Sequence, residues 1–269
     1  MIKYTEADLS AMSPDEFRNI VRSGQWTEHS MNKCRGYAVT DMVIIPKEYA
    51  YDYLVFAHRN PETVSIVDMT EAGSPHPLRV APDADLRTDL PRYQVYQNGK
   101  IIDEPTDIKK YWRDDLVGFL TGCSESFDWA LKNANVQYQV NGVFSTNIAC
   151  VPVGPFRGNM AVSCRLFKTS FDATRAVQIS SRHRIMHGAP VHIGDGRAIG
   201  IRDLSRPDLI AGWEGSKARE PAEGEVAMFW ACGATNRIVA AEAKLPLMIV
   251  DYPVSVFITD KLVEELAIL

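Results

Sequence analysis

The sequence predicts a mixed α/β fold: a three-layer α/β body with a smaller two-layer α+β domain set into it. Two observations lead to this prediction. Short apolar runs rich in β-branched residues alternate with helical patterns along the chain. In the C-terminal third, the apolar run 225–231 precedes a helical segment at 235–244 and a second apolar run at 247–250. A strand, a helix and a strand in this order are typical of a parallel sheet with helices on its faces.

The N-terminal residues predict a helix followed by a strand. Residues 4–22 have a polar helical pattern, in which Ser13 is a capping residue. Pro14 then occupies the first helical position, and Glu16 is placed to complete the cap. The apolar, β-branched run at 41–46 predicts a short strand that leads into the next helix.

The next segment is expected to contain a helix, ordered loops and a hairpin. Aromatic residues at helical spacing predict a helix over 48–58. The Pro, Asp and Gly content of 60–90 predicts short strands separated by loops. The predicted strands 93–96 and 101–102 flank Asn98-Gly99, a dipeptide that tolerates the positive φ angles of a type I′ turn.

The middle of the chain predicts a helix, two strands and a second helix. Residues 106–133 have a mostly helical pattern with an interruption at 121–124. Apolar segments at 148–153 and 160–167 predict a strand pair, and 174–183 predicts a short helix. This order suits a small two-layer domain.

Length, composition and charge exclude several classes of protein. The 269 residues are 46% hydrophobic, which suffices for one large domain or two small ones. We expect the body at 1–110 and 188–269 and the smaller domain at 111–187. The formal net charge of −5 argues against a surface that binds nucleic acid or an acidic membrane.

The sequence also predicts a cytoplasmic protein with reduced thiols. No apolar run approaches the ~18 to 20 residues that cross a bilayer, and the N-terminus is acidic where a signal peptide is basic. The five cysteines are widely spaced and lack a Cys-x-x-Cys pair, so we expect neither a disulfide framework nor a structural zinc site.

Segment 181–201 contains the richest group of chemically active residues, with His187, His192 and Asp195. The spacing allows a metal site to be considered, but Gly and Pro residues break any helix that would align the histidines. We therefore expect no metal. The alternatives that stay open are a loop followed by a hairpin, or an imidazole that carries protons near neutral pH.

Three arginines recur beside aspartates: Arg87, Arg92 and Arg113. A guanidinium group matches a carboxylate with two parallel hydrogen bonds, so one of them is a candidate for holding a substrate carboxylate. The same arginines are also placed to tie loops together by pairing with neighbouring acids. Those acids are Asp89, Asp114 and Asp115.

Two cysteines occur where ligands commonly bind. Cys123, with Ser124 and Ser126, stands at the predicted start of a helix, where backbone N–H groups attract anions and activate thiols. Cys232 ends a predicted parallel strand, the edge at which α/β proteins bind ligands. Both cysteines also suit a structural role as small buried side chains.

One further pair of donors precedes an apolar segment. Thr146 and Asn147 offer a hydroxyl and an amide just before the run that begins at residue 148. Groups of this kind line pockets for carboxylate oxygens or a developing oxyanion.

Six blocks of the sequence are informative when taken together: DLRTDLPRY (85–93), WRDDLVGFLTGCSESF (112–127), STNIAC (145–150), HGAPVHIGD (187–195), IGIRDL (199–204) and FWACGAT (229–235). They resemble the D-glutamate cyclase family, whose members are also labelled hydro-lyases. The likeness extends from about residue 41 to about residue 260. It implies a cytosolic bacterial enzyme with a mixed α/β fold of two parts. It also implies a carbon–oxygen lyase that converts D-glutamate to 5-oxo-D-proline with loss of water.

The chain departs from the pattern of this family at several positions. Glu125 stands where the family usually has Phe, and Ser145 where an Arg commonly occurs. Asp128 replaces a Glu, and Gly196 replaces a Pro. The segment 250–255, which includes Asp251 and Ser255, lacks the two histidines of a typical Thr-His-Ala-Pro-Gly-His stretch. These departures change the charge and proton chemistry of the expected pocket.

The resemblance gives the candidate residues roles in closing glutamate into a lactam. One of the three arginines would hold the α-carboxylate, and His187 or His192, assisted by Asp195, would move protons. The segments 123–124 and 146–147 would donate hydrogen bonds to the reacting carboxyl group. No phosphate-binding loop is present, so we expect no cofactor.

Alternatives to the cyclase stay open. One is a different lyase, or an amide-cleaving enzyme, that acts on a related small carboxylate. Another is a non-catalytic carboxylate-binding protein. The expected partner is in each case a small carboxylate, and a homo-oligomer is left open.

Overall fold

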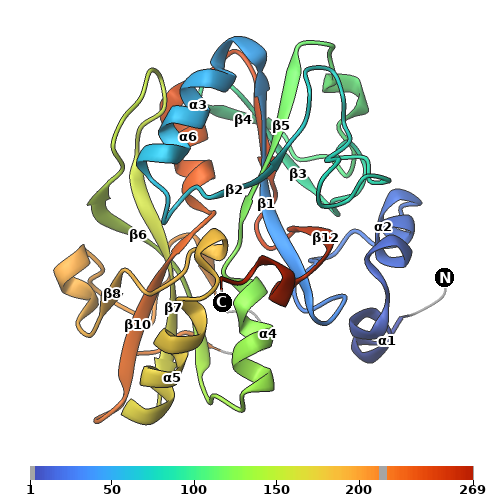
Figure 1. The fold of residues 1–269 in the computed structure, drawn as a ribbon. Coiled ribbons are helices and arrows are strands. Elements are labelled where there is room, and N and C mark those ends of the chain that lie inside the picture. The colour runs from blue at the N-terminus through green and yellow to red at the C-terminus, as the bar shows by residue number, and fades with distance from the viewer. Residues whose placement is uncertain (1–3, 212–216, 269) are drawn as a thin grey trace.

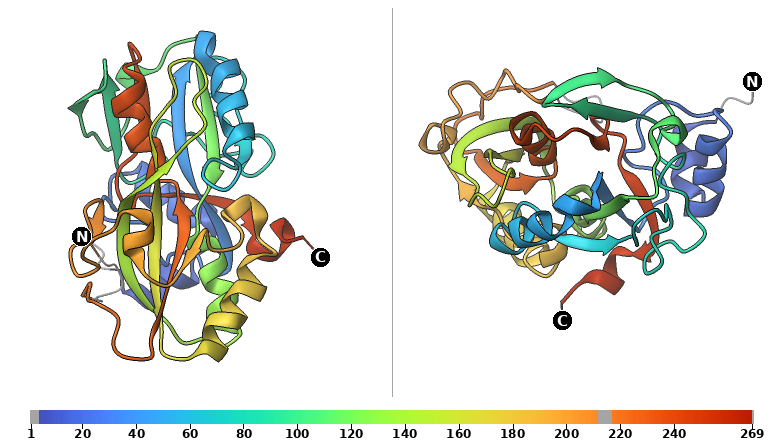
Figure 2. Two further views of the ribbon diagram at one scale, coloured as in Figure 1. Left: turned by 90° about the vertical axis from the view of Figure 1, so that its left-hand side faces the viewer. Right: turned by 90° about the horizontal axis from the view of Figure 1, so that it is seen from above.

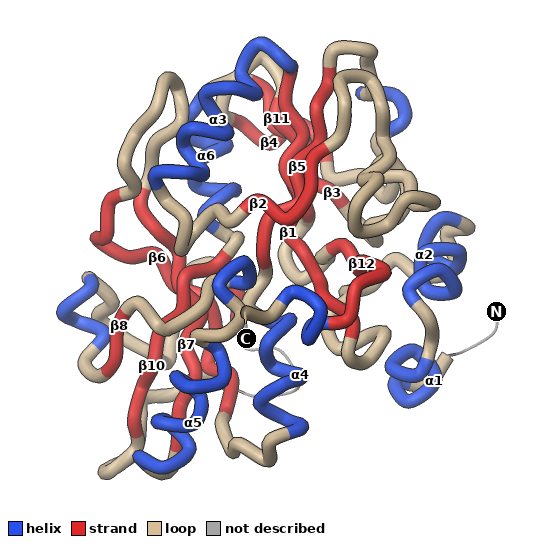
Figure 3. The backbone as a smooth tube through the Cα atoms, viewed as in Figure 1, coloured by secondary structure: helices blue, strands red, loops and turns tan. Residues whose placement is uncertain are grey.

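The strands of the protein form two antiparallel sheets, one above the other in Figure 1. This computed structural model describes residues 4–211 and 217–268, and the statements below concern those residues. The side view in Figure 2 shows the sheets stacked along the long axis of the molecule. Figure 3 distinguishes the helices and strands from the loops that connect them. The prediction of a mixed α/β fold is confirmed.

The first sheet contains the central strand β1 (Tyr37–Pro46), and its path runs β2-β5-β1-β11-β3-β4, with β12 also paired to β1. Its other strands are β2 (Ile66–Met69), β3 (Tyr93–Gln97), β4 (Lys100–Asp103), β5 (Leu116–Gly122), β11 (Met248–Asp251) and β12 (Phe257–Leu262). The hairpin of β3 and β4 turns at Asn98 and Gly99, whose φ angles are 49° and 79°. The predicted Asn-Gly hairpin is therefore confirmed.

Strand β1 changes partner along one of its sides. β5 follows the opposite side along 40–46, whereas β12 pairs near Thr40 and β11 pairs from Val43 onward. Between these two partners, the backbone N–H of Met42 donates to the carboxylate of Asp251 at 2.9 Å. A side chain thus satisfies a backbone donor at the point where the ladder is interrupted.

The second sheet has the order β8-β10-β7-β6-β9. Its strands are β6 (Gln139–Ala149), β7 (Asn159–Phe167), β8 (His192–Ile193), β9 (Ile210–Ala211) and β10 (Val226–Cys232). Helices α4 (Glu125–Asn133) and α5 (Ser170–Ser180) cover one face, where Phe127 and Trp230 pack together. The loop that contains Ile199 and Leu204 covers the other face.

The remaining helices cover the first sheet. Helices α3 (Lys47–Arg59) and α6 (Thr235–Ala243) lie side by side on one face, as Figure 1 shows, and bury Tyr53, Phe56 and Val239 there. The loop around Leu86 and Leu90 covers the opposite face. Helices α1 (Glu6–Ala11) and α2 (Pro14–Arg22) pack beside β12. No helix in the described part of the chain is both long and apolar enough to span a bilayer.

Three local predictions are wrong. The parallel strand–helix–strand unit does not form, because β10 belongs to the second sheet and β11 to the first, with α6 connecting them. Of the helical pattern predicted over 106–133, the part after the interruption at 121–124 is confirmed as α4, but the part before it is wrong. That part contains strand β5 at 116–122, which is buried throughout between β1 and β2. The single helix predicted over 4–22 is two helices, and each begins with a capping box.

Other predicted elements are confirmed with shifted ends. The predicted helices at 48–58, 174–183 and 235–244 correspond to α3, α5 and α6. The predicted strand pair is β6 and β7, although β6 begins and ends earlier than expected. The division into domains at 110/111 and 187/188 stays a prediction.

Candidate functional site

A small buried cavity lies where the two sheets meet. Its volume is about 30 Å³, roughly the space of one water molecule. Its polar lining comes from both sheets and from two helices. Asp41 lies on β1, Cys123 and Ser124 follow the end of β5, and Glu125 begins α4. Cys232 ends β10, and Arg237 lies on α6. Its apolar lining is Met31, Val143, Ile210, Val254 and Val256.

Two neighbouring carboxyl groups lie at this place: Asp41, which lines the cavity, and Asp251, which lies behind it and pairs with the lining residue Arg237. Both side chains are buried, at 5% and 1% exposure. Burial raises the pKa of Asp41 well above its usual value, and the neighbouring Asp251 raises it further. Burial also raises the pKa of Asp251, whereas Arg237 opposes the shift because its guanidinium group lies 3.2 Å from that carboxylate.

The two carboxyl groups have different hydrogen-bonding partners. Asp251 accepts from the Met42 N–H through one oxygen and from Arg237 through the other. For Asp41, hydrogen bonding by the Cys123 thiol lowers the pKa, against the larger effect of burial. The Oδ2 atom of Asp41 is buried and has no hydrogen-bond partner among the described residues.

Gly233 permits the close approach of the second sheet to Asp41. It follows Cys232 at the end of β10, and a Cβ atom at this position would overlap the Asp41 carboxyl group. Only glycine therefore fits between the end of β10 and β1 without displacement.

The two cavity thiols are protonated near neutral pH. Burial raises the pKa of Cys123 well above its usual value, and Asp41 and Glu125 add to the shift. Burial, together with the nearby Asp41, raises the pKa of Cys232 to about 12. These thiols therefore act as hydrogen-bond donors in the resting site, rather than as preformed thiolates.

A buried ion pair supports the cavity from behind α4. Arg165 of β7 donates to both oxygens of Asp128, at 2.9 and 2.7 Å, and both side chains are buried. The same guanidinium group reaches the carbonyl and hydroxyl oxygens of Ser124 at 3.4 Å. This network fixes the start of α4, where Ser124 and Glu125 line the cavity.

A second series of side-chain hydrogen bonds positions α6 and Arg237. The Tyr53 hydroxyl donates to the Asn236 side chain at 2.9 Å, and the Asn236 amide donates to the Thr121 hydroxyl at 3.1 Å. All three residues are buried. They connect α3, α6 and β5 next to the cavity, which fixes the helical turn that carries Arg237.

Comparison with known proteins identifies the family. The family model described as D-glutamate cyclase matches residues 117–260. A relative from Bacillus velezensis is 44% identical and covers 97% of this chain and 98% of its own. Relatives from Geobacillus kaustophilus and Bacillus subtilis are 43% and 42% identical over 96% of the chain and 98% and 100% of their own. All three carry the name "Putative hydro-lyase".

The chain belongs to the D-glutamate cyclase family. The resemblance inferred from the sequence blocks is therefore confirmed, and the expected lyase class agrees with the relatives' names. The part matched by the family model supplies most of the polar cavity lining, including Cys123, Cys232 and Arg237. Asp41 comes from outside the matched segment.

The structure brings together three of the residues that the sequence analysis proposed for this D-glutamate cyclase family member. Cys123, Ser124 and Cys232 all line the buried cavity. Ser126 lies nearby, but its hydroxyl group accepts from the Val39 N–H and donates to the Val39 carbonyl, both at 2.9 Å. It therefore anchors α4 to β1.

Thr146 and Asn147 lie on β6, away from the lining of this cavity. The Thr146 hydroxyl group donates to the Met160 carbonyl at 2.7 Å and accepts from the Ile148 N–H at 3.1 Å. Asn147 is exposed. Thr146 thus ties β6 to β7, and the role of both residues in substrate binding stays a prediction.

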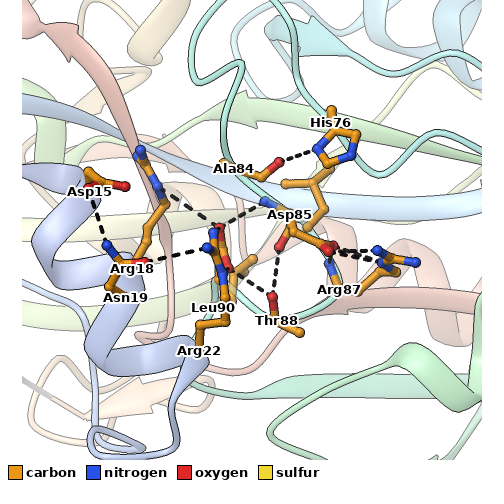
Figure 4. A network of polar contacts seen from close by, with 12 residues as sticks. Asp15, Arg18, Asn19, Arg22, His76, Ala84, Asp85, Arg87, Thr88 and Leu90 are labelled. Carbon is orange, nitrogen blue, oxygen red and sulfur yellow. Dashed lines mark hydrogen bonds and ion pairs between the residues drawn. The ribbon is translucent and has the colours of Figure 1, made fainter.

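The three predicted arginines pair with other groups. Arg87 binds both oxygens of Asp85, within a network that Figure 4 shows. Arg113 pairs with Asp115 at 2.8 Å on the surface. Arg92 lies 3.7 Å from Glu104 and stacks on the Tyr252 ring at 4.3 Å.

A buried carboxylate, Asp89, accepts hydrogen bonds from two residues that are labelled in Figure 4, Arg22 and Thr88. Arg22 of α2 donates to both of its oxygens, at 2.8 and 2.6 Å, and Thr88 donates at 2.8 Å. Arg18 lies 4.0 Å from the same carboxylate and also binds the Ile258 carbonyl. Through Asp89, the DLRTDL segment thus fastens the long loop to α2, and the pairing of Arg87 with Asp85 favours the structural alternative for this arginine.

The remaining candidates, His187, His192 and Asp195, lie elsewhere. His187 is buried, with Nδ1 2.8 Å from the Glu62 carbonyl, and it borders an open groove of about 850 Å³. Burial lowers its pKa to about 4. His192 contacts the backbone of Asp195, whose exposed carboxylate pairs with Arg197. The catalytic roles of these three residues stay predictions.

Asp41, Asp251 and Arg237 were not among the sequence-based candidates. Asp41 stands within an apolar, β-branched run, and Asp251 ends another. A carboxylate within a strand whose other residues are buried needs a partner or a function, because isolated buried charges are costly. An acid inside an apolar, strand-like run is visible in the sequence and could have pointed to Asp41 and Asp251. Among the described residues, no group of three or more ligand-type side chains has the arrangement of a metal site.

Proposed function

We propose that the protein is a cytoplasmic hydro-lyase that acts on D-glutamate, or on a related small amino or hydroxy dicarboxylic acid, at the buried cavity. With D-glutamate the product would be 5-oxo-D-proline. The observation that supports this proposal is the composition of the cavity: a cation, two neutral thiol donors and two carboxyl groups meet in one buried place. Most of these groups come from the segment that the family model matches.

The proposed reaction is a ring closure. The substrate nitrogen attacks the side-chain carboxyl carbon, a C–N bond forms, and a C–O bond breaks to release water. Arg237 would bind a substrate carboxylate, because a guanidinium group matches it geometrically. The thiols of Cys123 and Cys232 would donate hydrogen bonds to the oxygen on which charge develops. Holding amine and carboxyl together supplies much of the rate, up to roughly 7 to 11 kcal/mol at best.

The cavity must enlarge to admit this substrate, because about 30 Å³ holds only about one water molecule. The side chains that would have to yield are apolar ones, Met31, Val254 and Ile210. Val254 has a φ of 61°, a conformation that β-branched residues rarely adopt. Such strained positions are typical of segments that rearrange at binding sites.

The test is a product assay on the purified protein. D-glutamate, L-glutamate and a panel of amino and hydroxy dicarboxylic acids would be incubated with and without protein, and cyclic products resolved by chiral chromatography and mass spectrometry. We expect 5-oxo-D-proline from D-glutamate and loss of turnover in Arg237→Gln. The exposed Arg206→Gln, which makes the same chemical change, should leave turnover intact. Absence of product across the panel would refute the proposal.

A further inference from the structure

We propose that Asp41 and Asp251 form a carboxyl pair that shares one proton and moves protons during the reaction, with Asp41 as the acid and Asp251 as the base. The catalytic part of this inference rests on the proposed function. The sharing of one proton does not, because it follows from the resting structure alone.

The fold brings the two carboxyl groups together at the interruption in the ladder of β1. Asp41 belongs to β1 itself, and Asp251 ends β11, which begins to pair with β1 at Val43. The N–H of Met42, the residue next to Asp41, donates to the Asp251 carboxylate at 2.9 Å, and a hydrogen bond from Asp41 lowers the pKa of Asp251. A hydrogen bond between two carboxyl groups requires that one of them carries a proton.

The charges around the pair favour a single proton. Two buried carboxylates in contact cannot both ionise readily, and Arg237 supplies one positive charge at 3.2 Å from Asp251. One proton on the pair therefore leaves one negative charge to balance the guanidinium group. The other titratable groups that influence Asp41 come from α4, α3 and the ends of β5 and β10. They are Glu125, Tyr53, Cys123 and Cys232.

The hydrogen bonds decide which member carries the proton. Both oxygens of Asp251 accept from donors, the Met42 N–H and Arg237, which stabilise the ionised form. Asp41 has the weak donor Cys123, and its Oδ2 is buried without a partner among the described residues. The proton is therefore on Asp41. Environments that separate two carboxyl groups in this way are typical of acid and base pairs in enzymes.

Each proton of the proposed ring closure can be followed through the pair. Asp251 accepts a proton from the substrate ammonium, which frees the nitrogen lone pair. As the C–N bond forms, Asp41 donates its proton to a carboxyl oxygen and then recovers one from the nitrogen. Asp251 returns its proton to the departing hydroxyl, which leaves as water. At the end Asp41 is again protonated and Asp251 is again ionised. In net terms, the substrate nitrogen has lost two protons and the departing oxygen has gained two.

Infrared difference spectroscopy tests proton sharing without any substrate. At pH 7 we expect the unaltered protein to show the C=O stretch of a protonated carboxyl group that is lost in both Asp41→Asn and Asp251→Asn. In the second variant Arg237 is released to stabilise an ionised Asp41. Asp172→Asn, a half-buried acid on α5 that is distant from the pair in the fold, should retain the band. A band that persists in Asp251→Asn, or that is absent from the unaltered protein, would overturn proton sharing.

A second measurement does not depend on the folding of the variants. With carboxyl-¹³C aspartate in the unaltered protein, two resonances should titrate together, as expected of coupled groups. Two independent titrations would contradict the pair.

Turnover separates this inference from the proposed function. With a cyclising substrate, each Asn variant should lose kcat by roughly 100-fold or more, with a smaller change in KM. Retention of kcat and of its pH profile would refute the acid and base roles. If the shared proton is found but the substrate panel gives no product, the proposed function fails and the carboxyl pair stands.

Discussion

Burial of one imidazole makes the stability of this protein depend on pH. His187 has a pKa of about 4 in the folded protein, below the 6.5 of an unperturbed histidine. Between these pH values the unfolded chain binds more protons than the folded protein does. The contribution of neutral His187 to the free energy of unfolding is therefore fully present above about pH 6.5 and is lost as the pH falls toward 4.

We expect His187→Asn to flatten the dependence of stability on pH in this window. Asn tolerates the left-handed backbone at this position, where φ is 75°. Urea denaturation at pH values from 4.5 to 7 would measure the slope of the free energy of unfolding. An unchanged slope would show that other groups control the acid response.

The buried Arg165–Asp128 pair permits a test of how much one ion pair contributes to the free energy of unfolding. Arg165→Met leaves the Asp128 carboxylate buried without its partner, and we expect a loss of about 3 to 5 kcal/mol in the free energy of unfolding. The double variant Arg165→Met, Asp128→Leu should recover most of that loss, because neither charge then needs solvation. Denaturant unfolding measures both, with the exposed Arg206→Met as a control near zero. A double variant as unstable as the single one would contradict this explanation.

At individual positions, the sequence predicted the site only in part. The sequence predicts Cys123, Ser124 and Cys232 as site residues because they stand at the predicted ends of a helix and a strand. All three line the cavity. The arginines near 85–92 were conspicuous in sequence, yet in the structure they pair with acids close by. Asp41 and Asp251 are brought together by a strand pairing that spans most of the chain, which no local pattern encodes.

Among secondary-structure elements, those with local signals were predicted well. The capping box at Ser13 and the Asn98-Gly99 turn occur as expected, because each depends on neighbouring residues alone. Strand β5 was predicted as helix because a strand covered on both faces has no alternation, so its apolar run does not differ from that of a buried helix. The order of strands depends on contacts that local patterns do not report.

Two glycines offer a matched test of how the β3–β4 hairpin packs. Gly24 and Gly99 both have positive φ, 74° and 79°, but only Gly99 lies against another element. A Cβ at Gly99 would overlap the Ala241 carbonyl of α6, whereas a Cβ at Gly24 would meet no atom within 4 Å. We expect Gly24→Ala to cost about 1 to 2 kcal/mol for the backbone alone and Gly99→Ala to cost clearly more. Equal losses in urea denaturation would show that the hairpin is free to move off α6.

For the molecule as a whole, the cavity depends on both sheets. Asp41 and Asp251 belong to the first sheet, Cys232 ends a strand of the second, and Gly233 permits their contact. We expect a chain that ends at Lys244 to fail to fold, since it lacks both β11 and β12. Circular dichroism and limited proteolysis of this truncated chain would measure the effect. Native-like, protease-resistant material would show that β1 does not need these strands.

The partners of β1 also determine when the protein can fold in the cell. Thr40 pairs with Phe257 and Val43 with Val250, more than two hundred residues later in the chain. During synthesis, β5 can pair with one edge of the apolar strand at 41–46, but the other edge must stay unpaired until residues 250–257 have left the ribosome. Such long-range pairing is slow and leaves intermediates prone to aggregation. We infer that holding the nascent chain apart from other chains is the critical step in producing this protein, and that its yield depends on chaperones more than its final stability would suggest.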